Sequence, residues 1–389
     1  MVSRLALGFV TLSWLLAASP ALAKASWDDL PTLQEAQAGA QAGDKTMQFE
    51  LALRLYLGVE VPQDSAAAYG WFMKAAVQGH AGAQYNVGGM LQIGEGVPAD
   101  EKAAVGWLHK AAEQGHLPAQ VQLGRAYDEG VGVAKDVASA VRWYRRAAEA
   151  GDDQGQNQLG LKYYFGEGVA LDFPTAMAWF RRAAEQDNAQ GQLNLGVMYR
   201  RGEGVEVDYD AANRWLRLAA AQDEPSAMNQ IGLMYDQAEG VTEDDEEAVK
   251  WYRQAAENSL AAGQYNLGLM YRDGTGIDRD ARQAFQYVTL AAEQGHLEAQ
   301  STLGEFYTSG TGTAQDYQLA HTWLKKAADG QEPEAQYRLG RLYLNGFGVA
   351  KDELQALAWM KKAEAQGHAA AHAVVQQLEK SAKPAPAKK

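Results

Sequence analysis

The sequence predicts an all-α solenoid of nine helix–turn–helix repeats, each 36 residues long, with a polar capping helix at either end. Two observations predict this fold. An apolar residue followed by glycine recurs every 36 residues from Val87-Gly88 to Leu339-Gly340, and an aromatic residue recurs with the same period from Trp71 to Trp359. A fixed period of about 20 to 50 residues is typical of repeat arrays, in which each repeat packs only against its neighbours.

The same period sets the domain boundaries. The predicted repeats are 45–80, 81–116, 117–152, 153–188, 189–224, 225–260, 261–296, 297–332 and 333–368. Residues 24–44 form a partial copy in which Glu35 replaces the aromatic residue, which predicts an N-terminal capping helix. After His368 the pattern decays, which predicts a C-terminal capping helix over 369–380 and a disordered tail over 381–389.

The first 23 residues resemble a secretory signal peptide. Arg4 precedes an apolar run of 14 residues, which is too short to span a bilayer, and Ala21-Leu22-Ala23 is a small-residue cleavage site. We therefore expect a periplasmic or secreted protein that begins at Lys24. The chain has no cysteine, which excludes disulfides and lipid attachment to cysteine.

Without the signal peptide, 34 basic residues face 49 acidic ones, a net charge of −15. A surface with this excess of negative charge repels phosphate backbones and anionic headgroups, so we expect neither nucleic-acid binding nor direct membrane insertion.

Each repeat is expected to contain a helix A and a helix B. Helix A covers the equivalents of Ala81 to Gln92 and ends at a Gly-x-Gly-Val turn. Asp recurs just before helix B, as an N-cap residue would, and Asp244 with Glu247 adds the spacing of a capping box. The Asp residues are Asp64, Asp100, Asp136, Asp172, Asp208, Asp244, Asp280, Asp316 and Asp352.

Helix B carries the pattern Ala-x-x-Trp-x-x-Lys/Arg-Ala-Ala. Its small residues predict a close approach to the glycine of helix A. The Trp is expected to fill the wedge between neighbouring repeats, where full burial would contribute at least about 2 to 3 kcal/mol.

The consensus A-x-A-Q-x-x-L-G-x-x-Y-x-x-G-x-G-V-x-x-D-x-x-x-A-x-x-W-x-x-K-A-A-x-x-G resembles the SEL-like (Sel-one-like) repeat, a relative of the tetratricopeptide repeat, over residues 45–368. The resemblance implies a right-handed α-solenoid that binds partner proteins and has no chemistry of its own. It also implies an envelope role, because exported bacterial members act in envelope regulation, exopolysaccharide assembly, motility complexes and host interaction. One branch of the family is rich in cysteine and has a disulfide in each repeat, and this chain departs from that branch because it has no cysteine.

The sequence predicts no catalytic, cofactor-binding or metal-binding residues. The Gly-x-Gly loops lack the strand and the following Lys-Ser/Thr of a phosphate loop. His368 and His372 lack the Glu of a His-Glu-x-x-His motif, and the acidic run Glu239 to Glu247 lacks the spacing of a calcium loop. Four His share the turn after helix B, which favours a solvated polar turn residue; they are His80, His116, His296 and His368.

Positions that vary between repeats predict where partners bind. On a helical wheel, the equivalents of Asn86 and Gly89 point away from the core, and in the middle of the array they form an amide ladder beside four apolar side chains. The candidate partner-binding residues are Gln122, Arg125, Gln158, Leu161, Asn194, Val197, Gln230, Leu233, Asn266 and Leu269. Met198, Met234 and Met270 are placed at the edge of this face, where they would adapt to partner side chains.

The sequence therefore predicts an exported, non-enzymatic scaffold that holds protein or extended peptide segments on a concave face lined by the A helices. Charged residues would provide selectivity, namely Arg125, Arg200, Arg201, Arg272 and Arg341. Two alternatives stay open. The apolar stripe could instead seal the packing between repeats, and the chain could instead be an envelope polysaccharide or cell-wall factor that binds glycan, with weak hydrolytic activity.

Overall fold

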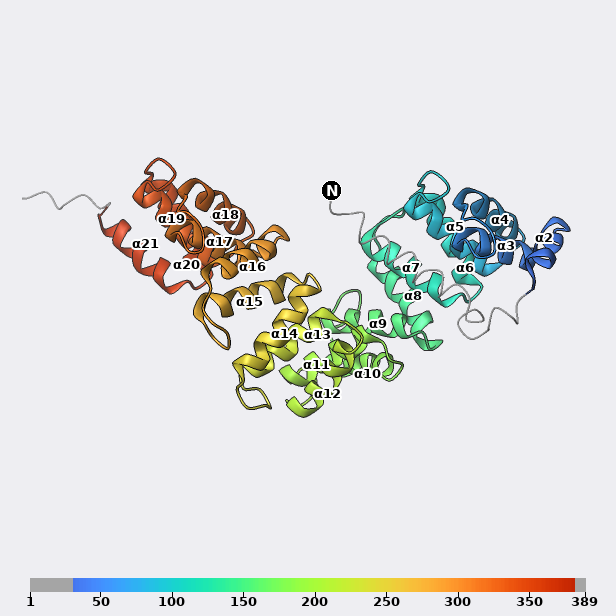
Figure 1. Cartoon of the computed structure of the whole chain (residues 1–389), viewed down its shortest axis with the longest axis horizontal. Helices are drawn as coiled ribbons and strands as arrows, with labels where there is room; N and C mark the ends of the chain where they lie inside the picture. The colour runs from blue at the N-terminus through green and yellow to red at the C-terminus, as the bar shows by residue number, and fades with distance from the viewer. Residues whose placement is uncertain (1–30, 382–389) are drawn as a thin grey trace, which may run out of the picture. The chain divides into compact units, whose positions relative to one another are not determined.

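A computed structural model describes residues 31–381, and this part of the chain contains 20 helices and no strand (Figure 1). The predicted all-α solenoid is confirmed: helices follow one another in pairs, one pair per repeat. The predicted signal peptide (1–23) and all of the predicted tail except Ser381 lie outside the described residues.

Every repeat supplies one helix A and one helix B. The A helices are α3 (Lys45–Leu57), α5 (Ala81–Ile93), α7 (Leu117–Glu129), α9 (Asp153–Phe165), α11 (Ala189–Arg201), α13 (Pro225–Asp236), α15 (Ala261–Asp273), α17 (Leu297–Ser309) and α19 (Pro333–Asn345). The B helices are α4 (Ser65–Val77), α6 (Glu101–Glu113), α8 (Val137–Glu149), α10 (Phe173–Ala184), α12 (Tyr209–Ala220), α14 (Asp245–Glu257), α16 (Ala281–Glu293), α18 (Tyr317–Asp329) and α20 (Glu353–Ala365). Two further helices flank the repeats, α2 (Leu33–Gln41) and α21 (Ala369–Ser381).

The chain forms two compact halves. The N-terminal half is Met1–Met198 with Gly202–Glu206, and the C-terminal half is Tyr199–Arg201 with Val207–Lys389, so the division falls within α11. From α2 to α10 in the first half, and from α12 to α21 in the second, each helix packs against the next one along the chain. Neighbouring A helices also touch directly, as α7 and α9 do in the first half and α17 and α19 in the second.

The predicted Asp N-caps are confirmed at all nine B helices. In α6, for example, Asp100 Oδ1 accepts a hydrogen bond of 2.9 Å from the Ala103 amide. The capping box predicted at Asp244 is only half formed. Glu247 donates its amide to Asp244, but its carboxylate accepts from Lys250 and from the Trp251 indole instead.

Glycine lets the two helices of a repeat approach closely, as predicted. A Cβ added to Gly88 would lie 2.8 Å from Leu108 Cγ and 3.2 Å from the carbonyl oxygen of Ala104. In the turn that follows helix A, Gly96 has a φ of 69°, and a Cβ there would collide with the carbonyl of Ser65 in the preceding repeat. Glycine at these positions is thus required for packing both within and between repeats.

The Trp residues of helix B are less buried than predicted. Trp143 and Trp359 are 8% exposed, and the others are half-buried. The outer face of the ring is covered by the basic residue three positions later, since Lys74 Nζ lies 3.6 Å from the Trp71 ring centre. The cation–π pair replaces part of the expected burial. The same pair forms at Trp107, Trp143, Trp179, Trp323 and Trp359.

The four turn histidines are N-caps of the following helix, so their interpretation as solvated turn residues is wrong. His80 Nδ1 accepts a hydrogen bond of 3.1 Å from the Ala83 amide at the start of α5. Its ring stacks on Phe49, in helix A of its own repeat, at 4.4 Å, and the side chain is half-buried. The remaining three repeat both contacts, His116 with Tyr85, His296 with Tyr265 and His368 with Tyr337.

A column of buried glutamines links successive repeats. Gln84 Nε2 donates to the carbonyl of Ala76 at the end of the preceding helix B, at 3.0 Å. Its Oε1 accepts from Gln114, which follows helix B of its own repeat, at 2.7 Å. The bond to the preceding helix B recurs at Gln48, Gln120, Gln156, Gln192, Gln264, Gln300 and Gln336.

Candidate partner-binding surface

The predicted amide ladder lies in the seam between adjacent A helices. Asn194 donates to Asn157 of the preceding helix A at 2.9 Å, and Asn266 donates to Asn229 at the same distance. Gln122 is only 9% exposed. Because a residue at the Asn86 position faces the neighbouring repeat, part of its hydrogen-bonding capacity is used internally.

The apolar residues at the Gly89 position are half-buried: Leu161, Val197, Leu233 and Leu269. Leu233 packs against a core cluster that contains Leu267 and Met270. The methionines were placed wrongly, since Met198, Met234 and Met270 are 1%, 1% and 6% exposed and belong to the core. The buried face of helix A is therefore one residue wider than the helical wheel suggests, because it includes the residue that follows the Gly89 position.

A hollow of about 180 Å³ in the N-terminal half brings three predicted residues together: Leu161 on α9, and Asn194 and Val197 on α11. Tyr164, Phe165 and Phe180 complete its lining. The Phe165 ring is 61% exposed and meets Tyr164 edge-on at 4.9 Å. This hollow is therefore apolar, with an amide at its wall.

A larger hollow, of about 310 Å³, lies on α17 and α19 of the C-terminal half. These helices belong to the last two repeats, outside the central repeats in which partner binding was predicted. Glu305, Arg338 and Arg341 line the hollow, and they occupy the Asn86 and Gly89 positions of their repeats. The other lining residues are Thr308, Ser309, Leu324, Glu334, Tyr337, Leu342, Asn345 and Phe347. The positions predicted to bind partners thus line a hollow here too, with charged residues in place of apolar ones.

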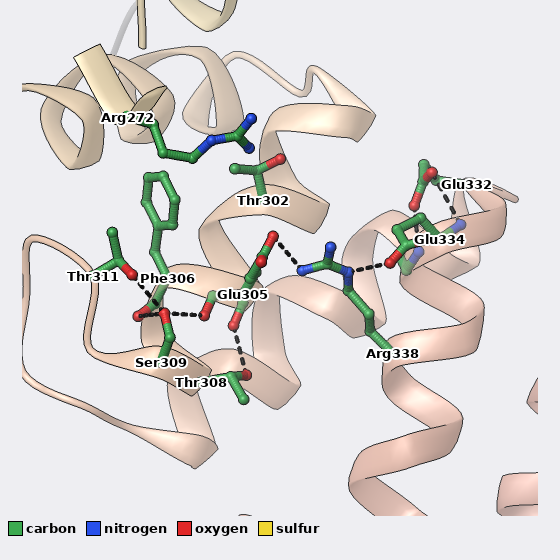
Figure 2. Close-up of polar contacts among 12 residues, drawn as sticks. Arg272, Thr302, Glu305, Phe306, Thr308, Ser309, Thr311, Glu332, Glu334 and Arg338 are labelled. Atoms are coloured by element: carbon green, nitrogen blue, oxygen red, sulfur yellow. Dashed lines mark hydrogen bonds and ion pairs between the residues drawn. The ribbon is translucent and has the colours of Figure 1, made fainter. Parts of the chain in front are cut away.

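Arg338 is held between two carboxylates, as Figure 2 shows. Its Nη1 lies 2.5 Å from Glu305 Oε2 on α17, and its Nε lies 2.5 Å from Glu334 Oε1 on its own helix. Burial opposes the charge of Arg338, but the two carboxylates more than compensate and raise its pKa. Burial also opposes the charge of Glu334, yet bonds from His368 and Arg338 lower the pKa of that carboxyl group. The cluster ties α17 to α19 and fixes one wall of the hollow.

Four of the five predicted selectivity arginines fall into two groups, and the fifth, Arg201, is exposed. Arg200 is paired with Glu239, and Arg272 is paired with the adjacent Asp273. Arg125 is half-buried and Arg341 is exposed, and neither has an ion-pair partner among residues 31–380. Of the charged residues in the larger hollow, Arg341 is thus the cation that is not neutralised.

Sequence reasoning missed Thr308, Tyr337, Leu342 and Asn345, because it followed only two positions of helix A, the equivalents of Asn86 and Gly89. A signal was present nonetheless: Glu305 and Arg338 replace the usual amide or apolar residue in consecutive repeats, which indicates a salt bridge between A helices.

Within the described range, no group of three or more His, Asp or Glu side chains is arranged to hold a metal ion. His368 and His372 contact different carboxylates, Glu334 at 2.7 Å and Glu364 at 2.6 Å. No helix between residues 31 and 381 is both long and apolar enough to cross a membrane.

These features define a solenoid of helix pairs whose variable residues line hollows on the A helices. The Sel1 repeat model matches residues 46–80, 81–116, 117–152, 153–188, 189–224, 225–260, 261–296, 297–331 and 333–368. The chain therefore belongs to the Sel1 repeat family, whose members generally act as protein-interaction scaffolds and are generally non-enzymatic.

Two solved structures are similar to it. The first is a protective antigen of uropathogenic Escherichia coli strains with an SLR fold: identity is 32%, the TM-score is 0.58, and the match covers 90% of this chain and 83% of the antigen. The second is a Sel1 repeat protein from Oxalobacter formigenes, with 31% identity, a TM-score of 0.57, and coverage of 63% and 96%. A search of curated proteins gives no match.

Proposed function

We propose that this chain is an exported scaffold that holds extended segments of partner proteins on the face of its A helices, within a cell-envelope assembly or regulatory complex. One observation carries the proposal: two positions of helix A that vary between repeats, the equivalents of Asn86 and Gly89, line a hollow in each half of the chain. The positions shared by all repeats account for folding, so the variable ones are available for recognition.

The chemistry of these hollows suits a peptide. Asn194 lines one hollow and Asn345 the other, and an amide side chain carries both donors and an acceptor, as a peptide backbone does, and can pair with an extended segment. The hollow at Leu161 offers an apolar wall for one side chain, and the exposed Phe165 ring beside it is the kind of surface that a partner covers.

A glutamate substitution tests the proposal. Leu161→Glu, in the N-terminal hollow, and Leu233→Glu, at the same helix position, should abolish partner capture from an envelope fraction by crosslinking while the helical circular-dichroism signal is kept. Leu218→Glu is the matched control, because Leu218 is 48% exposed on helix B. Trp143→Ala should destabilise the chain by about 3 to 5 kcal/mol. If Leu161→Glu and Leu233→Glu unfold the chain in the same way, the apolar residues at the Gly89 position serve packing between repeats and not partner binding.

Export is supported by the composition of Met1–Ala23. Expression of the full chain in a Gram-negative host should give a mature protein that begins at Lys24 and is released with the periplasm or the medium. Retention of Met1 in the cytosol would contradict this part of the proposal.

A second candidate is binding of an envelope polysaccharide, which the aromatic pair Tyr164 and Phe165 favours because sugar rings stack on exposed aromatic faces. Calorimetric titration with polysaccharide from the native envelope separates the two candidates. Binding of polysaccharide that Phe165→Ala removes would support glycan recognition over peptide recognition.

A further inference from the structure

The hollow on α17 and α19 contains two arginines in different states. Arg338 is neutralised by Glu305 and Glu334, each at 2.5 Å. Arg341, one turn further along α19, is exposed and lies over the Tyr337 ring at 5.9 Å, with no carboxylate in ion-pair range in the described part of the chain. In a chain with a net charge of −14, a guanidinium left unpaired beside a cluster of carboxylates is unusual.

Two side-chain oxygen atoms in the hollow with Arg341 are available to accept hydrogen bonds from a ligand. Thr308 donates its hydroxyl proton to the carbonyl of Gly304 at 2.8 Å, so its oxygen lone pairs remain available. Asn345 donates its amide to the carbonyl of Arg341 at 2.9 Å, which leaves its Oδ1 as an acceptor. Backbone amides of an extended ligand would satisfy both oxygens.

Leu324, Leu342 and Phe347 form the apolar part of the lining. Leu342 forms part of the floor, and the Phe347 ring is 42% exposed and stacked on Tyr317 at 4.9 Å. A ligand that matches the whole hollow therefore carries a carboxylate for Arg341, backbone amides for Thr308 and Asn345, and an apolar side chain for Phe347.

We propose that this hollow selects partner segments in which an acidic side chain, Asp or Glu, adjoins an apolar residue, with the carboxylate bound by Arg341. Because the chain as a whole repels acidic partners, an acidic residue is favoured only where it reaches Arg341, and this sets the register of the segment. The inference rests on the proposed function and names the class of segment that this hollow takes.

The experiment uses the full mature chain and a library of random decapeptides, N-acetylated and C-amidated so that side chains supply the only carboxylates. Captured peptides should be enriched in an acidic residue beside an apolar one. Replacing that acid by its amide should weaken binding by about tenfold, the expected loss for one charge-assisted hydrogen bond. Arg341→Gln should remove the difference between acid and amide peptides, and Arg341→Lys should keep part of it.

Arg214→Gln is the matched control, since Arg214 is an exposed arginine on helix B of the same half, lines neither hollow, and should leave the preference unchanged when replaced. Arg341 is exposed, so its variants should melt like the parent chain. Capture without acid enrichment, or a preference that survives Arg341→Gln, overturns this inference but leaves the proposed function standing. A second library with free C-termini is screened in parallel: capture from that library but not from the C-amidated one also overturns this inference, while failure to capture any peptide from either library overturns both.

Discussion

Gly88 lies where helix A of the second repeat crosses helix B, and the space for a side chain there is already filled by Leu108 and the Ala104 carbonyl. Gly106, on the exposed face of α6, has open space around its missing Cβ. Close packing therefore requires glycine at Gly88, whereas at Gly106 a larger residue would fit.

Gly88→Ala should destabilise the chain by about 1 to 3 kcal/mol, because the added methyl group overpacks the contact between the helices. Gly106→Ala should stabilise it by about 0.5 to 1 kcal/mol, because alanine has less conformational freedom in the unfolded chain. Urea unfolding followed by circular dichroism measures both. A change of the same sign in the two variants would show that close packing at Gly88 is not what requires glycine.

The histidine N-caps make stability depend on pH. Burial lowers the pKa of His80, with a further decrease from Lys45, and burial lowers that of His296 against the opposing effect of Glu298. Each ring accepts an amide hydrogen through Nδ1, so protonation removes the cap.

Since the unfolded chain takes up these protons at a pH of about 6.5, before the folded chain does, stability should fall as the pH drops below that value and level off below the folded-state pKa. The double variant His80→Asp/His296→Asp keeps a capping oxygen that stays ionised at pH 5.5. The loss in urea midpoint between pH 7.5 and 5.5 should be smaller in this variant than in the parent chain. An equal loss in both would assign the pH dependence to other groups.

At the scale of helices, the glutamine column shows what the sequence could and could not predict. The Asp caps and the glycine turns were predicted because each depends on residues within one turn of chain. The glutamine bonds were not, because Gln84 and Gln114 are 30 residues apart and each looks like a surface amide. Burial of the methionines also depends on the neighbouring repeat, which a wheel of one helix does not contain.

Two repeats lack the amide side chain that forms this bond. Ala150 and Gly330 stand where other repeats have Gln or Asn after helix B, and at the first of these junctions Gln120 Oε1 is buried with no hydrogen-bond partner in the described structure. Ala150→Gln should therefore stabilise the chain by about 0.5 to 1.5 kcal/mol. Gln114→Ala, which leaves Gln84 Oε1 without its partner, should destabilise it by a similar amount. Differential scanning calorimetry compares the two; no gain in Ala150→Gln beside a clear loss in Gln114→Ala would show that Gln120 is already satisfied by water.

At the scale of the whole molecule, the repeat period alone was enough to predict the fold, because packing in such an array is local. The division into two halves within α11 was not predictable, since the pattern runs through residues 189–224 unchanged. For the candidate site, the sequence indicated helix positions that line the two hollows but favoured the central repeats, and the larger hollow lies on α17 and α19. Which repeat forms a hollow depends on side-chain size and ion pairing across two helices, and periodicity carries no information on either.

The repeat 225–260 departs most from the others. Met228 replaces the linking glutamine, with only a sulfur contact of 3.8 Å from Asn258. Ala238 has a φ of 53° where other repeats have glycine, a conformation that costs a non-glycine residue about 1 to 2 kcal/mol.

This repeat should open first, because the stability of an array is a sum of local terms. In hydrogen exchange followed by mass spectrometry, amides of α13 should exchange faster than those of α15 or α19. Ala238→Gly should slow that exchange and raise the urea midpoint. Uniform exchange along the C-terminal half would instead indicate that the half unfolds as a single cooperative block.

The glutamine column has a consequence for how such a chain changes over generations. Wherever the column is intact, each junction presents the same donor and the same acceptor as the junction before it. A gene duplication that adds one whole copy of 36 residues between two such junctions would leave every one of these bonds closed. The number of repeats, and with it the length of surface offered to a partner, can therefore vary by inheritance without a new folding problem. The junctions at Ala150, Met228 and Gly330 lack this shared bond, so a copy inserted there would not reproduce it.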